Sequence, residues 1–80
     1  MSINKEERAT MGTTFGQYIR AVRTTAGCSQ DTMAEKIKVE KSTISRWEAG
    51  KAFPKRTQLK RLIDLFPSYK EQMIDAWLND

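Results

Sequence analysis

SQDTMAEKIKVEKSTISRWEAG, residues 29–50, is the stretch that predicts the fold most directly. It contains two runs of apolar residues at helical spacing, and residues 38–40 interrupt the pattern between them. Ser29 is a favourable N-cap for the first helix, and Gly50 is the type of residue that ends many helices in the left-handed conformation. The stretch therefore predicts two short helices joined by a tight turn.

Small and apolar side chains on these helices are expected to face each other. Ala34 lies in the middle of the first helix, and its methyl group lets the second helix, about residues 41–49, cross closely. The side chains expected to fix the angle between the helices are Ile37, Val39, Ile44 and Trp47. Because Trp47 follows Ile44 at helical spacing, we interpret it as a core residue rather than one that stacks on a base.

The face of the second helix that remains outside carries short side chains flanked by long cations: Lys41, Ser42, Thr43, Ser45 and Arg46. Such a face fits a major groove about 12 Å wide. Arg46 or Lys41 can donate to O6 and N7 of guanine, and the methyl group of Thr43 can contact thymine. The two serines can donate to or accept from base edges, and ordinary surface exposure is the alternative interpretation for them.

The N-terminal part of the chain divides at about residue 13. Residues 1–12 lack a periodic apolar pattern, and we expect them to form a flexible arm. A helix is predicted from Thr13 or Thr14, where Thr14 and Gln17 match a capping box, and Gly27 is expected to end it. This helix precedes the pair described above.

Two more helices are predicted after a loop over residues 51–56. We expect Thr57 to cap the first of them and Pro67 to stop it. Ser68 with Glu71 forms a second capping-box pattern, which predicts the start of the last helix. The expected fold class is therefore all-α, with five helices.

The last helix carries an apolar stripe of Met73, Ile74, Trp77 and Leu78. Two interpretations are open: the stripe packs back on the rest of the domain, or it forms a twofold interface between two copies. A single 80-residue copy makes too few base contacts for tight specific binding. We therefore expect a homodimer on double-stranded DNA, with this helix as the candidate interface.

Positive charge is concentrated in the middle of the chain. The formal net charge is +4, residues 1–12 are neutral in total, and residues 68–80 have more acidic than basic side chains. Residues 51–61 include five cations and no acid. A phosphate-contacting surface has this character, and a solvated helix face is the alternative interpretation.

The composition argues against several other classes of protein. No apolar run is long enough to cross a bilayer, and the first residues lack the apolar stretch of a signal peptide. With Cys28 as the single cysteine and no histidine, the chain offers no intramolecular disulfide and no credible zinc site. We expect a cytoplasmic protein of a bacterial or phage-infected cell that is not an enzyme and uses no cofactor, metal, membrane or small-molecule ligand.

Residues 15–66 resemble the lambda repressor/Cro-like helix-turn-helix proteins, also called the XRE family. The resemblance rests on IRAVRTTAG, SQDTMAEKI, STISRWEAGK and the helix after Pro54. It implies a compact five-helix fold with a DNA-binding helix-turn-helix domain at residues 13–67. Residues 68–80 would then form a C-terminal helix for core packing or dimerisation.

The resemblance also implies roles for individual residues. Those that fall on or near the base-reading positions of the family are Lys41, Ser42, Thr43, Ser45 and Arg46. Those that fall where the family contacts the DNA backbone are Gln30, Lys51, Lys55 and Arg56. Arg23 and Glu48 correspond to a partly buried ion pair that ties the first helix to the end of the third.

Three residues depart from the family pattern. Lys38 stands where the turn usually has glycine, and a left-handed conformation there would cost about 1 kcal/mol. Glu40 stands where serine or threonine usually caps the third helix; its carboxylate favours a helix N-terminus but faces DNA unfavourably. Cys28 replaces a larger apolar residue. These departures affect the expected position and orientation of the third helix.

The implied function is a sequence-specific transcription regulator. A repressor of phage or plasmid type, binding an inverted repeat as a dimer, is the leading hypothesis. An activator of lambda-like phage type is one alternative, because VEKSTISRW at residues 39–47 resembles a pattern found in such proteins. A protein-interaction module such as an antitoxin, with the C-terminal stripe as its docking face, is another.

Overall fold

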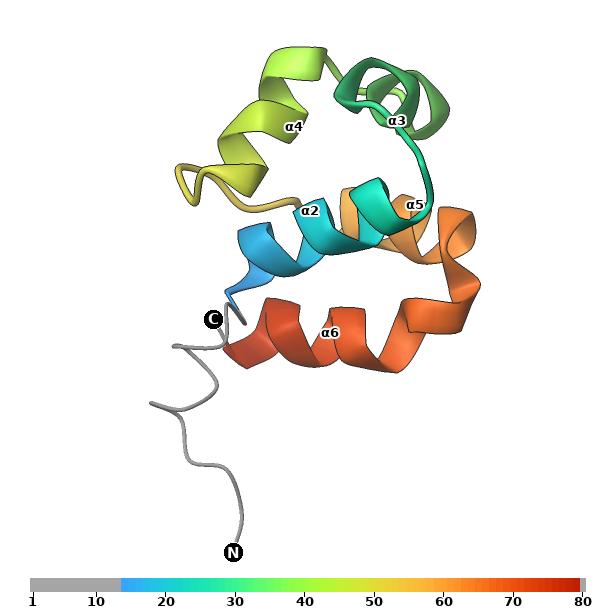
Figure 1. The fold of residues 1–80 in the computed structure, drawn as a ribbon. Coiled ribbons are helices and arrows are strands. Elements are labelled where there is room, and N and C mark those ends of the chain that lie inside the picture. Colours follow the sequence, from blue (N-terminus) through green and yellow to red (C-terminus); the bar gives the residue numbers. More distant parts are fainter. Residues whose placement is uncertain (1–13, 80) are drawn as a thin grey trace, which may run out of the picture.

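The computed structural model describes residues 14–79 of the chain. Within this range it contains α2 (Phe15–Thr25), α3 (Gln30–Ile37), α4 (Lys41–Glu48), α5 (Arg56–Leu65), a 3₁₀ turn η1 (Pro67–Tyr69) and α6 (Lys70–Asn79) (Figure 1). No strand occurs among these residues, so the all-α prediction is confirmed. None of these helices is long and apolar enough to span a bilayer. The arm expected at residues 1–12 falls outside the described range.

The predicted starts of α2 and α3 are confirmed by their capping hydrogen bonds. The N–H of Gln17 donates to the Thr14 hydroxyl at 3.3 Å, and the N–H of Thr32 donates to the Ser29 hydroxyl at 3.0 Å. These hydroxyls satisfy backbone donors that have no partner within the helix. Both starts therefore follow from local sequence.

The predicted start of α5 is wrong. The helix begins at Arg56, and the backbone N–H of Lys55, the residue before it, donates to the side-chain oxygen of Gln58 at 2.7 Å. Thr57 consequently lies inside the first turn and not at the cap. The amide of Gln58 reaches back over the helix start and satisfies the N–H of Lys55, as the fourth residue of a capping box does.

The predicted start of α6 is also wrong. Ser68 lies within η1, and the N–H of Tyr69 donates to the carbonyl oxygen of Phe66 at 3.0 Å to close this turn. Proline suits the first position of a tight helical turn because its φ is already fixed and no N–H is needed there. Pro67 therefore does not simply end a helix, and α6 starts only at Lys70.

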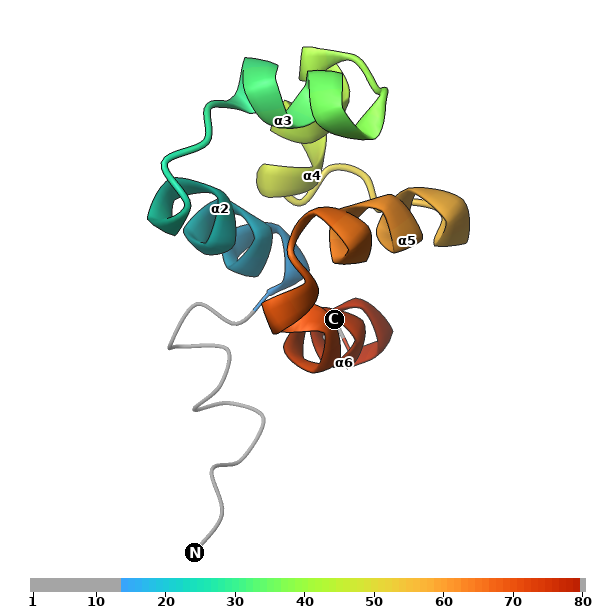
Figure 2. The same ribbon diagram turned by 90° about the vertical axis from the view of Figure 1, so that its right-hand side faces the viewer.

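The core lies between two groups of helices. α3 packs on α4 and α5, whereas α6 contacts α2 and α5 on the side away from α3 and α4 (Figures 1 and 2). The buried side chains that form one cluster come from all of these helices: Phe15, Ile19, Met33, Ala34, Ile37, Ile44, Trp47, Leu59, Leu62 and Met73. Met73 is fully buried within a single copy, which supports the first interpretation of the stripe, packing on the rest of the domain, for this residue.

A glycine allows the start of α2 to approach the end of α4. Gly16 is buried, and a Cβ atom at this position would clash with the carbonyl oxygen of Trp47 and lie 3.1 Å from that of Glu48. Both obstacles are backbone atoms, which cannot move aside as a flexible side chain can. Gly16 was not predicted to matter, because nothing in the local sequence marks the position as a helix crossing.

The turn between α3 and α4 contains a residue in a strained conformation. Lys38 has φ 63° and ψ 48°, which is the left-handed region, and it is the one non-glycine residue with positive φ among residues 14–79. The N–H of Val39 donates to the carbonyl oxygen of Ala34 at 3.0 Å across this turn. The turn thus has the shape that usually requires glycine, and the lysine costs about 1 kcal/mol there.

Substitution of Gly16 by alanine is expected to destabilise the fold by about 1–3 kcal/mol, because the added methyl group overpacks the α2–α4 crossing. Helix propensity alone would give the opposite sign, a gain of about 1 kcal/mol. Urea unfolding measures the difference. Ala21→Gly, at an exposed position of the same helix, is the control and should cost only about 1 kcal/mol. A more stable Gly16→Ala protein would contradict the close approach.

Substitution of Lys38 by glycine is expected to stabilise the fold by about 0.5–1 kcal/mol, because glycine adopts the left-handed conformation without a Cβ clash. Lys36→Gly is the matched control: this lysine is exposed in the last turn of α3, where glycine should cost up to about 1 kcal/mol. Thermal unfolding of the two variants should therefore shift in opposite directions. Equal losses of stability would show that Lys38 is not strained.

Candidate nucleic-acid interface

The outer face of α4 is polar because its apolar residues are buried. Ile44 and Trp47 are 0% and 2% exposed, so α4 packs against the core through these two side chains. The side chains that face away are the exposed Lys41, Ser42, Ser45 and Arg46 and the half-buried Thr43. Four of the five residues predicted to read bases therefore lie in solvent on one short helix, and Thr43 lies at the edge of this face.

The position of α4 in the molecule leaves this face accessible. α3 and α4 form one end of the domain, and α6 lies at the other (Figures 1 and 2). The turn between α3 and α4 is tight and the two helices pack on each other, so they form one structural unit. In this arrangement the outer face of α4 meets no other helix among residues 14–79.

An ion pair joins the start of α4 to the start of α3. The ammonium group of Lys41 lies 3.6 Å from a carboxylate oxygen of Asp31, and both side chains are largely exposed. An exposed pair of this kind contributes about 0–1 kcal/mol to stability. Its position matters more, because it brings an acid to the edge of the polar face. Asp31 was not predicted from the sequence, since only the packing of α3 on α4 brings the two residues together.

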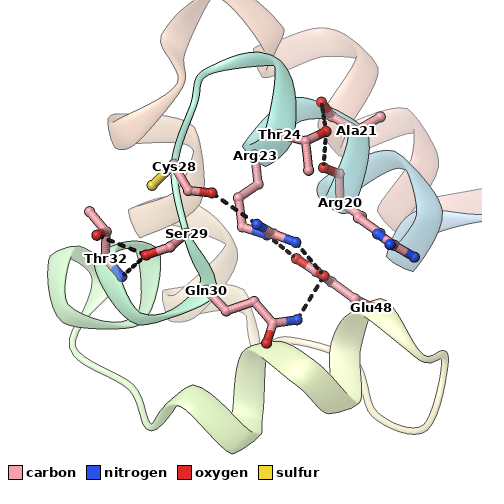
Figure 3. A network of polar contacts seen from close by, with 9 residues as sticks. All are labelled: Arg20, Ala21, Arg23, Thr24, Cys28, Ser29, Gln30, Thr32 and Glu48. Carbon is pink, nitrogen blue, oxygen red and sulfur yellow. Dashed lines mark hydrogen bonds and ion pairs between the residues drawn. The ribbon is translucent and has the colours of Figure 1, made fainter.

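The end of α4 is fixed by the carboxylate of Glu48. Arg23 on α2 donates to Glu48 through two nitrogens, from Nε to Oε2 at 2.6 Å and from Nη2 to Oε1 at 3.0 Å. The Arg23 and Glu48 side chains are 11% and 5% exposed. Arg23 also donates from Nη1 to the carbonyl oxygen of Cys28 at 2.9 Å. Figure 3 shows the arginine between these two partners. The structure thus contains the ion pair that the resemblance implied.

This bidentate contact stabilises the charged form of the arginine. The hydrogen bond with Glu48 raises the pKa of Arg23 above its ordinary value, even though burial acts in the opposite direction. Planar two-point contacts between guanidinium and carboxylate are stronger and more directional than a single hydrogen bond. The pair therefore sets both the distance and the angle between α2 and the last turn of α4.

Gln30 is part of the same network. Its amide nitrogen donates to Oε1 of Glu48 at 2.9 Å, so Glu48 binds residues of both α2 and α3 (Figure 3). The residue was predicted to contact the DNA backbone, and its bond to Glu48 was not foreseen. The amide of Gln30 thus holds the end of α4, while the residue itself stands at the first position of α3.

The predicted backbone-contacting cations lie after α4. Lys51, Lys55 and Arg56 are all exposed in the loop and at the start of α5. The N–H of Lys51 donates to the carbonyl oxygen of Arg46 at 2.8 Å. This hydrogen bond places the first cation of the loop directly beside the end of α4.

The remaining cations of residues 51–61 have other contacts. Arg61 donates from Nη1 to the carbonyl oxygen of Ile37 at 3.2 Å, which satisfies a free acceptor at the end of α3. Lys60 forms an exposed pair with Asp64 at 3.8 Å, one turn further along α5. The cations of residues 51–61 therefore have different roles. Arg61 is a structural residue, and counting charges in the sequence did not identify it as one.

The residues of the C-terminal stripe also differ from one another, in how far each side chain is exposed. Ile74 and Trp77 are half-buried beside the core residue Met73, whereas Leu78 is 66% exposed. Of the four residues proposed for a twofold interface, Leu78 therefore offers the largest free apolar surface.

Comparisons with known proteins agree with this geometry. A family model described as a helix-turn-helix domain matches residues 14–68. The HTH-type transcriptional activator BcrR of Enterococcus faecalis is 33% identical over 62 residues, which are 78% of this chain but 30% of that relative. The chain thus spans less than a third of the length of that curated relative. No solved structure matches the chain significantly.

The matched residues 14–68 include all of α2, α3, α4 and α5, and with them the paired short helices that the sequence predicted. The chain belongs to the helix-turn-helix domain family, in agreement with its resemblance to the lambda repressor/Cro-like proteins.

Proposed function

We propose that this protein is a transcription regulator that binds double-stranded DNA as a dimer and places α4 of each copy in the major groove of an inverted repeat. The observation that carries the proposal is the outer face of α4, where cations and hydroxyl groups stand exposed on a helix whose other side is buried. A helix of this width fits the groove, and the side-chain types match the donors and acceptors of base edges. The family and the relative named above support the same class of function.

Within this proposal, four exposed residues of α4 read bases. Arg46 and Lys41 donate to guanine, and Ser42 and Ser45 contact whichever base edge lies opposite them. Thr43, at the half-buried edge, makes a contact with a thymine methyl group. Asp31 limits the reach of Lys41 through their ion pair, so we expect Arg46 to contribute more to base preference than Lys41.

The phosphates on either side of the groove are contacted by Gln30 and by the exposed cations Lys51, Lys55 and Arg56. Gln30 contributes through the backbone N–H groups at the start of α3, because its side chain is bound to Glu48. Lys51 lies beside the end of α4 and therefore reaches the backbone next to the bases that Arg46 contacts. These contacts set the register of α4 without reading sequence.

A dimer follows from the small size of the reading face. Two copies on half-sites about one helical turn apart double the number of base contacts. Leu78, with Ile74 beside it, supplies the exposed apolar surface for the contact between copies. The leading hypothesis is a repressor of phage or plasmid type. An activator is the second candidate, and it is favoured by the name of the relative, an HTH-type transcriptional activator.

Selection of duplexes from a random pool, followed by salt titration, tests the proposal. The wild-type protein should recover an inverted repeat, and its affinity should fall steeply with salt. Arg46→Ala should cost about 1–3 kcal/mol and relax the base preference at one position of each half-site. Lys51→Ala should weaken all sequences alike and reduce the salt dependence by about one phosphate contact per copy.

Lys70→Ala is the control for charge, because Lys70 is an exposed cation on α6, away from α4. It should leave both base preference and salt dependence unchanged. The division of roles is wrong if Arg46→Ala and Lys51→Ala change binding in the same way. The proposed function itself is wrong if no sequence is enriched over the starting pool.

A further inference from the structure

The loop between α4 and α5 receives a hydrogen bond from the far end of the chain. The indole Nε1–H of Trp77 on α6 donates to the carbonyl oxygen of Pro54 at 3.0 Å. The acceptor belongs to the backbone of the loop, 23 residues earlier in the sequence. This contact connects the C-terminal helix with the segment that carries Lys51 and Lys55.

Neighbouring contacts hold the same part of the loop. The ring of Phe53 packs on that of Phe15 with centroids 5.4 Å apart, and Pro54 itself is buried. Ala52 is half-buried against the core. Ala52 and Pro54 are thus turned towards the protein, while Phe53 is 45% exposed and touches Phe15 with part of its ring.

The two ends of the loop are held by the helices that they adjoin. The N–H of Lys51 donates to the carbonyl oxygen of Arg46 on α4 at 2.8 Å, and that of Lys55 donates to Gln58 on α5 at 2.7 Å. Both lysine side chains remain exposed. The loop therefore has a defined backbone with two cations on its outside, and the hydrogen bond to its middle comes from α6.

We propose that Trp77 is a positioning residue for DNA binding: through Pro54 it fixes the loop so that Lys51 and Lys55 meet the phosphates beside the groove that α4 enters. This inference rests on the proposed function and assigns α6 a part in it. The indole ring is half-buried and its N–H is already donated, which favours this role over the twofold interface that the sequence suggested.

The physical advantage of such a contact is preorganisation. A mobile loop loses conformational freedom when its cations bind phosphates, and this loss weakens binding. A loop that is already ordered avoids that loss, whereas a released loop brings its cations to the phosphates only part of the time and makes fewer contacts. Because phosphate contacts carry no sequence information, the effect should appear in affinity and salt dependence and not in base preference.

Trp77→Phe is the variant that tests this role, because it removes the N–H donor and retains an aromatic ring. Binding to the duplex selected by the wild-type protein should weaken about two- to tenfold, as expected when one hydrogen bond is removed. The slope of log K against log salt should become shallower by about one for each phosphate that the loop no longer reaches. The base preference should be unchanged. Gln72→Ala, at an exposed position of the same helix, should alter none of these quantities.

The salt slope separates positioning from a general loss of stability. A variant that only lowers the folded fraction weakens binding at every salt concentration by the same factor and keeps the wild-type slope. The inference is overturned by an unchanged slope in Trp77→Phe. It is also overturned if the variant selects single half-sites, since Trp77 would then act at the contact between copies. Failure of the wild-type protein to bind any duplex would instead overturn the proposed function.

A measurement on the wild-type protein covers the case in which Trp77→Phe does not fold. The chain has two tryptophans, so its NMR spectrum contains two indole N–H signals. The Trp77 signal should exchange with solvent slowly in the free protein and stay protected on binding the selected duplex. Exchange as fast as that of a solvent-exposed indole would show that the contact with Pro54 does not hold the loop.

Discussion

The carboxylate of Glu48 is the point on which the rest of this structure depends. It lies at the last residue of α4 and accepts hydrogen bonds from Arg23 on α2 and Gln30 on α3. Because both charged side chains are almost fully buried, removal of one partner would leave the other charge without compensation, at a cost of about 3–5 kcal/mol. The glycine at position 16 lets α2 come close enough for this contact. One carboxylate therefore fixes the position of the end of α4 relative to both α2 and α3.

The consequence for function lies on the other side of α4. A helix of eight residues is too short to be stable alone, so its direction is set by packing at its inner face and its end. With Ile44 and Trp47 buried and Glu48 held, the cations and hydroxyl groups of α4 have one direction in which to point. Such a rigid polar face suits the reading of base edges, because little freedom is lost when it binds. The loop after α4 receives a hydrogen bond from Trp77 on α6, and in our proposal this contact prepares its cations for phosphates in the same way.

Local sequence predicted the helices well, since caps and helical spacing act over a few residues. Thr14 and Ser29 cap their helices as expected, whereas the left-handed conformation of Lys38 was anticipated from the family pattern of the turn. The two wrong caps have different causes: α5 begins earlier, with the Gln58 side chain folded back to the N–H of Lys55, and the residues before α6 form the 3₁₀ turn η1. Contacts between distant residues could not be predicted without the fold. The pairs that arise only from tertiary packing are Gly16 with Trp47, Gln30 with Glu48, Asp31 with Lys41, Arg61 with Ile37 and Trp77 with Pro54. The Arg23–Glu48 pair was reached through family resemblance and not through spacing.

The central claim is that the outer face of α4 touches bases. Isotope-filtered NMR of the complex with the selected duplex tests it most directly, through nuclear Overhauser effects between protein and DNA protons. We expect such effects from Ser42, Ser45 and Arg46 to major-groove protons such as cytosine H5, purine H8 and thymine methyl groups. Effects to these base protons from α6 instead, with none from α4, would contradict the claim.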